Sequence, residues 1–251
     1  MSERINRIGE EKVNTYGTLM IIVEYINNKK IKVEFQDEYK MIVSTSYNHF
    51  LDGKVKNPYD KSVQGIGYLG VGKYNTMKDS KVYICWKNMF KRAYDEKYHE
   101  KYPSYRDVSI CEEWHCFQNF AKWYEENYYE CNGEQMHLDK DILIKGNKIY
   151  SPKTCIFVPY NINQLFVKTN AKRGNFPIGV SMDKRRETYS AFISYNKEHN
   201  NLGCFKDVHS AWLMYKLNKE LVIQCVADEY KDLIPSKLYD ALYSYEVEIN
   251  D

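Results

Sequence analysis

Apolar and polar residues at the start of the chain follow the pattern of β-strands. An apolar run covers 19–25, residues 31–35 alternate between apolar and charged side chains, and a third run follows at 39–43. A period of two places every second side chain on the same face of a sheet. The pattern predicts an antiparallel meander of three to five strands, or a small barrel, over residues 1–72.

In the middle of the chain the apolar spacing becomes that of a helix. Apolar side chains three or four positions apart predict a helix over 82–94. Tyr102 and Pro103 interrupt this pattern, and a second aromatic stripe predicts another helix that begins at Ile110 and continues through Tyr124. Aromatic stripes at this spacing are typical of a helix core rather than of a cofactor site.

A compact ββα unit is predicted next. Residues 136–144 are typical of a strand, a Lys/Gly/Asn-rich turn follows, 156–159 form a second apolar run, and a helix is expected from Asn161 to about Lys168. If the first strand is regular through Asp141, His137, Asp139 and Asp141 lie on one face of it.

The last third predicts three short strands and a helix. The strands are expected at 173–180, 189–193 and 202–205, separated by turns rich in Asn, Gly and Lys. Ala211, Trp212 and Tyr215 then follow helical spacing. This pattern favours a three-stranded sheet packed on one helix.

Together these elements predict an α+β protein in three parts. A small N-terminal β-sheet or barrel occupies 1–72, a central helical and ββα unit occupies 73–170, and a three-stranded sheet with a helical tail occupies 171–251. The Gly-rich stretch 65–72 is interpreted as a linker between the first two parts.

Net charge is small overall but uneven along the chain. The 36 basic and 34 acidic residues leave only +2 in total, so bulk charge does not indicate a nucleic-acid partner. Residues 167–206, however, hold eight basic and three acidic side chains, a net charge of +5, whereas 207–251 hold four basic and nine acidic ones. This distribution predicts a positive sheet face suited to phosphates; a solvated charged hairpin is the alternative.

Targeting and redox signals point to an intracellular protein. No apolar run approaches the roughly 20 residues of a membrane span, and the N-terminus lacks the core of a signal peptide. The seven cysteines contain no Cys-x-x-Cys pair, so thiols are expected rather than disulfides. Five Cys and His side chains could be grouped as a zinc site, but their spacing fits no known module; they are Cys111, His115, Cys116, Cys131 and His137.

One phosphate-loop pattern is rejected. Gly67, Gly72 and Lys73 have the required spacing, but Tyr74 stands where a magnesium-binding Ser or Thr is needed.

The C-terminal pattern resembles the APETALA2/ERF-type DNA-binding domain, in which a three-stranded sheet enters the major groove and a helix backs it. The resemblance covers about 173–230 and rests on spaced elements in the right order. These are Gly179-Val180, the alternating Tyr189, Ala191 and Ile193, Leu202-Gly203 with Phe205, and Ala211 with Tyr215.

Residues 82–168 resemble HNH-type (ββα-metal) homing endonucleases of phages and mobile elements, in which such a unit is often joined to an APETALA2-type domain. The matching residues are Trp86, Met89, Arg92, Tyr102, Tyr105, Cys111, Trp114, Phe117, Phe120, Leu138–Asp141 and Tyr150–Pro152 with Cys155. The resemblance implies metal-dependent cleavage of double-stranded DNA with Mg²⁺ or Mn²⁺, in the cytoplasm of a bacterial host.

Site residues can be assigned on this basis. His137 is the candidate base and Lys140 the alternative base. Asn161 or Asn163 could supply the amide from the helix, and Asn163 is the one assigned to the site. Asp139 and Asp141 are the candidate metal ligands, because carboxylates suit both Mg²⁺ and Mn²⁺. Asp139 is also counted among the candidate catalytic residues. The candidate DNA contacts are Lys172, Arg173, Lys184, Arg185, Arg186, Tyr189, Tyr195 and Lys197.

Two departures keep a second function open. Active members of the nuclease family carry His after the strand Asp, where this chain has Lys140, and Asn before the Cys, where it has Thr154. A lysine is a poor general base at neutral pH unless it is strongly desolvated. The alternative is therefore a catalytically inactive DNA- or protein-binding phage factor: a regulator, or an inhibitor of a host defence nuclease such as an anti-CRISPR protein.

Overall fold

The computed structural model describes residues 6–167, 176–195 and 198–249, and it is an α+β fold as predicted. The chain forms two compact units. One comprises the chain up to Glu126 together with Lys148–Pro152, and the other comprises Asn127–Asn147 together with the chain from Lys153 onward. This division differs from the predicted borders at 72/73 and 170/171.

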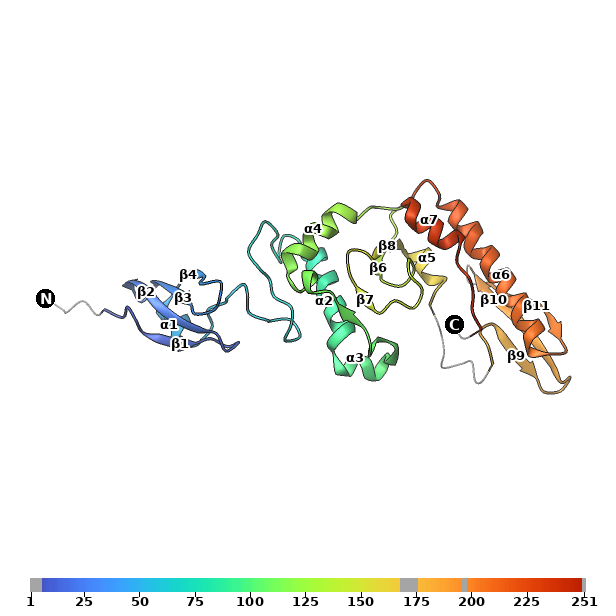
Figure 1. The fold of residues 1–251 in the computed structure, drawn as a ribbon, viewed down its shortest axis with the longest axis horizontal. Helices are drawn as coiled ribbons and strands as arrows, with labels where there is room; N and C mark the ends of the chain where they lie inside the picture. The colour runs from blue at the N-terminus through green and yellow to red at the C-terminus, as the bar shows by residue number, and fades with distance from the viewer. Residues whose placement is uncertain (1–5, 168–175, 196–197, 250–251) are drawn as a thin grey trace. The chain divides into compact units, whose positions relative to one another are not determined.

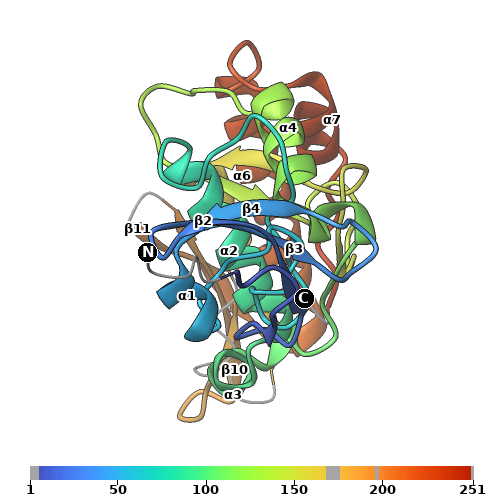
Figure 2. The same cartoon turned by 90° about the vertical axis from the view of Figure 1, so that its left-hand side faces the viewer.

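The predicted N-terminal meander is a four-stranded antiparallel sheet in the order β1-β2-β3-β4 (Figures 1 and 2). Its core holds the alternating apolar side chains of β2 and β3 together with Phe50 of α1. The elements are β1 (Glu11–Val13), β2 (Leu19–Asn27), β3 (Lys30–Phe35), β4 (Ile42–Thr45) and α1 (Tyr47–Leu51).

A buried carboxylate fixes the segment that follows this sheet. Asp60 Oδ2 accepts a hydrogen bond from Asn14 Nδ2 at 2.7 Å, and its Oδ1 accepts one from Thr18 Oγ1 at 2.6 Å. Asp60 and Asn14 are both buried, and buried polar groups are stable only when they are paired. The network therefore ties Asp60 to the turn between β1 and β2.

The Gly-rich stretch 65–72, interpreted from the sequence as a loop and linker, packs closely against α2 and α4. A Cβ at Gly67 would lie 2.8 Å from the ring of Phe90, and one at Gly70 would lie 2.6 Å from Sγ of Cys116. Only glycine allows the backbone to approach these side chains so closely. Close packing explains the glycine spacing that resembles a phosphate loop.

The helical part of the first unit differs from prediction at one place. The expected helix from Ile110 is instead a short strand and a 3₁₀ turn, and α4 begins only at Phe117. Backbone groups of this stretch pair with distant segments, because β5 runs parallel to β7 and Trp114 O accepts the indole N–H of Trp86 at 2.8 Å. The elements are α2 (Ser80–Tyr94), α3 (Glu96–Lys101), a 3₁₀ turn (Pro103–Tyr105), β5 (Ser109–Ile110), a 3₁₀ turn (Glu112–His115), α4 (Phe117–Asn127) and β7 (Ile149–Tyr150).

The second unit contains the predicted ββα order in a shorter form. β6 (Met136–Asp139) pairs antiparallel with β8 (Ile156–Pro159), and α5 (Tyr160–Gln164) follows. The predicted strand 136–144 therefore ends at Asp139, and the predicted helix ends at Gln164.

The C-terminal sheet is a three-stranded antiparallel meander in the order β11-β10-β9 (Figure 1). The first strand begins at Val180, the last residue of the predicted range 173–180, and continues to Asp183. Residues 173–175 lie outside the described ranges. The elements are β9 (Val180–Asp183), β10 (Thr188–Tyr195), β11 (Glu198–Phe205), α6 (Val208–Glu229) and α7 (Ser236–Tyr243).

Helix α6 contributes to three buried clusters. In its N-terminal half, Ala211 packs with Val180 and Ala191 of the sheet, and Tyr215 packs with Ile193. In its C-terminal half, three buried side chains join the core that contains residues of β8, α5 and α7; they are Ile223, Val226 and Ala227. Among the described helices, none is long and apolar enough to cross a membrane.

The contact of the sheet with α6 requires glycine at the entrance to β9. Gly179 has a φ of +76°, and a Cβ there would overlap the ring of Tyr215. We expect Gly179→Ala to lower the free energy of unfolding by about 2–5 kcal/mol, through the backbone penalty and the steric overlap. Urea unfolding followed by circular dichroism measures this change.

Gly146→Ala is the matched control. Gly146 has a φ of +77°, but nothing lies within 4 Å of a Cβ built there. This variant should lose only the backbone term, about 1–2 kcal/mol. Equal losses in the two variants would contradict the role given to the Tyr215 contact.

Candidate functional site

The antiparallel β6–β8 pair positions the predicted base and the first predicted metal ligand. His137 lies opposite Val158 and Asp139 lies opposite Ile156, so the two side chains are on one face of β6. The His137 ring centroid is 5.8 Å from that of Tyr160 at the start of α5. The structure thus places His137 beside the start of α5, whereas Asp139 lies two positions further along β6, opposite the first residue of β8.

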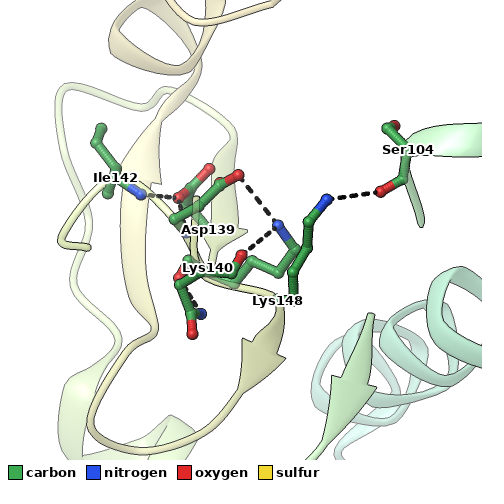
Figure 3. Close-up of polar contacts among 7 residues, drawn as sticks. Ser104, Asp139, Lys140, Ile142 and Lys148 are labelled. Atoms are coloured by element: carbon green, nitrogen blue, oxygen red, sulfur yellow. Dashed lines mark hydrogen bonds and ion pairs between the residues drawn. The ribbon is translucent and has the colours of Figure 1, made fainter. Parts of the chain in front are cut away.

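Asp139 ends the strand and holds the turn after it (Figure 3). Its Oδ1 accepts the backbone N–H of Asp141 at 2.9 Å and that of Ile142 at 2.7 Å. This is the local turn that Asp side chains favour. Since the chain turns here, Asp141 is not on the strand, and the prediction that His137, Asp139 and Asp141 share one strand face is wrong.

Lys140 is a structural cation inside the loop (Figure 3). It is only 7% exposed. Its Nζ lies 3.1 Å from Oδ2 of Asp141 and donates to the carbonyl oxygen of Asn147 at 3.2 Å. Asn147 Nδ2 donates in turn to the carbonyl of Lys140 at 2.7 Å. These bonds close the loop 140–147 and engage the Lys140 side chain within it.

The pKa of Asp139 is raised from 3.8 to about 6. Burial is the largest cause, and the negative charge of Asp141 adds to it. The two backbone N–H groups and Lys140 act in the opposite direction, because they stabilise the carboxylate.

The carboxylates do not form an evident metal site. One oxygen of Asp139 is taken by two amides, and Asp141 is paired with Lys140. In the described part of the chain, no three or more His, Cys, Asp or Glu side chains are arranged to hold a metal ion.

Helix α5 contributes to a polar network that the sequence did not indicate. Asn163, the predicted amide, lies half-buried in α5. Its neighbour Asn161 donates its backbone N–H to Glu134 at 3.0 Å and its side-chain amide to the Tyr230 hydroxyl at 3.2 Å. The Tyr230 hydroxyl also donates to Glu134. Burial, and then the bond to Glu134, raise the pKa of Tyr230 to about 12.

No local sequence signal could have found this network, because Tyr230 is 96 residues from Glu134 along the chain.

The basic residues of the C-terminal sheet gather in the turn between β9 and β10. Lys184, Arg185 and Arg186 are all exposed. Asp183 Oδ1 accepts the backbone N–H of Arg185 at 2.9 Å, which shapes the turn. The three cations therefore extend from one end of the sheet.

Five other predicted DNA contacts are not placed on the exposed face of the sheet. Tyr189 packs in the cluster between sheet and α6, with its ring centroid 5.8 Å from that of Phe176. Tyr195 packs against the core that contains residues of β8, α5 and α7. Both rings are thus directed to apolar cores, contrary to the expected surface role. Lys172, Arg173 and Lys197 lie outside the described residues.

Comparison of the chain with protein-family models, with curated proteins and with solved structures gave no match. The activity is therefore inferred from the residues and geometry described above.

The raised pKa of Asp139 predicts a dependence of stability on pH. Between about pH 4 and 6 the native state binds more protons than the unfolded chain, so this group's contribution to stability falls as pH rises. Asp139→Asn keeps the acceptor for both backbone amides and removes the charge. We expect this variant to be more stable than the wild type at pH 7 by about 1–3 kcal/mol, and equally stable at pH 4.

Urea unfolding at pH 4, 5, 6 and 7 measures the difference. Asp232→Asn serves as the control, because Asp232 is exposed and its substitution should change stability by less than about 0.5 kcal/mol at every pH. A constant difference between Asp139→Asn and the wild type across this range would contradict the assignment.

Proposed function

We propose that the protein binds double-stranded DNA through its C-terminal three-stranded sheet. One observation carries the proposal: α6 packs on one face of the sheet (Figure 1), while the other face carries the exposed side chains Ser181, Ser194 and Asn201 and ends at the basic turn 184–186. A β-sheet face is narrow enough to enter the major groove, and flanking Arg and Lys side chains can neutralise phosphates. The resemblance to APETALA2-type domains supports the same orientation.

The structure of the loop after β6 supports DNA binding without DNA cleavage by the residues of this loop. Lys140 stands at the position of the family's base and is paired with Asp141. Asp139 is engaged by the backbone of its own turn. The geometry therefore supports the DNA-binding factor better than the metal-dependent nuclease.

Cleavage of DNA with Mg²⁺ or Mn²⁺ is the second proposal. It is favoured by the β6–β8–α5 order, which matches the ββα order of HNH-type nucleases and places His137 and Asp139 on one face of β6. In this proposal His137 would be the base, and Asn163 would act from α5.

Replacing both Arg185 and Arg186 with Ala should weaken binding to duplex DNA. If each arginine neutralises one phosphate, the slope of log K against log salt should fall in magnitude by about 1.8, or about 0.9 per contact. Fluorescence anisotropy at several salt concentrations measures both effects.

The matched control replaces Lys29 and Lys30, two exposed lysines in the hairpin turn of the N-terminal sheet. That variant should bind as the wild type does. Equal binding by the arginine variant and the wild type would exclude the C-terminal turn as a phosphate contact.

Supercoiled plasmid should stay intact when the wild type is added with Mg²⁺ or Mn²⁺ under conditions where binding is saturated. Gel electrophoresis shows nicked or linear product directly. Nicking by the wild type that is lost in Asp139→Asn, while DNA binding persists, would instead establish the second proposal. Nicking that is equal in both proteins would point to a contaminant or another site.

A further inference from the structure

The exposed face of the C-terminal sheet carries one aromatic pair. Ala191 and Ile193 are buried against α6, so Phe192 between them points to the opposite face. Phe192 belongs to neither cluster between the sheet and α6. Its ring stacks on that of His199 from β11, with centroids 5.0 Å apart and ring planes inclined by 12°.

Two local features hold this pair in place. His199 Nδ1 lies 2.8 Å from Oγ of Ser194, a hydrogen bond that fixes the imidazole. The register between β10 and β11 shifts next to Phe192, and there Asn201 Oδ1 accepts the backbone N–H of Gly203 at 2.8 Å. A bulge of this kind directs side chains and is often found at functional places.

The surroundings of the pair are small and uncharged. By strand register, the neighbouring positions on this face are Ser181, Ser190, Ser194, Asn201 and Cys204. Asp183, which lies opposite Thr188, is on the same face but nearer the turn 184–186. An uncharged patch with one apolar projection does not suit phosphates. It suits the floor of the major groove, where thymine is the base that presents a methyl group.

We propose that Phe192, supported by His199, contacts the C5-methyl group of a thymine in duplex DNA. The proposal rests on the DNA-binding function proposed above. In this arrangement the cations of the turn 184–186 neutralise phosphates and give affinity, while Phe192 distinguishes thymine from other bases. Bases in a duplex present only their edges in the groove. Phe192 therefore contacts the methyl group of thymine and does not stack on the base.

The test uses a duplex selected from a random-sequence pool by the wild-type protein. Each thymine is replaced singly by deoxyuridine, which lacks only the methyl group. At one position we expect binding to weaken about four-fold, the effect of burying one methyl group. Phe192→Ala should bind thymine and deoxyuridine duplexes equally.

Arg185→Ala is the matched control. It should weaken binding to both duplexes while keeping the ratio between them, because a phosphate contact does not distinguish bases. The deoxyuridine comparison uses wild-type protein, so it does not depend on the folding of any variant.

Three results would overturn the inference. Wild-type binding without a deoxyuridine effect at any position would exclude the methyl contact and leave the proposed function intact. Tighter binding to single strands than to the duplex would replace it with base stacking on Phe192. Absence of duplex binding at all salt concentrations would remove the proposed function and this inference together.

Discussion

The burial of α6 on two sides is the constraint on which the second unit depends. A helix that is apolar around most of its circumference needs partners on more than one face. Its Ala211 and Tyr215 cover the C-terminal sheet, and Ile223 and Val226 complete the core of β8, α5 and α7. The sheet proposed to bind DNA and the ββα segment therefore share one structural element, and neither has a complete core without it.

Sequence patterns correctly predicted the helices and strands that bury one face against a single core, because the spacing of their apolar residues reflects that face. The alternation in 31–35 and 189–193 corresponds to β3 and β10, and the helical spacing after residue 80 corresponds to α2. The same patterns gave wrong predictions where backbone groups pair with segments far away in the sequence. The aromatic spacing from Ile110 fits a helix, but β5 pairs with β7 some 40 residues later along the chain, and local periodicity holds no information on such a pairing.

The candidate site was predictable only in part, for a related reason. The spacing of His137 and Asp139 places them on one strand face, as the register of β6 with β8 bears out. The strand's end at Asp139 and the burial of Lys140 depend on the loop back to Asn147. Lys140 supplies, from within the chain, positive charge beside Asp141. Two aspartates spaced like metal ligands can thus have part of their charge neutralised by the lysine between them in the sequence.

The path of the chain between the two compact units has a consequence for inheritance. The second unit begins at Asn127, is interrupted by Lys148–Pro152, and resumes at Lys153. The interrupting segment contains β7, which pairs with β5 of the first unit. Neither unit is therefore encoded by one uninterrupted stretch of gene. Recombination that transfers a single block ending near residue 126 or 147 would separate paired strands, so exchange among related genes should favour blocks that carry both units.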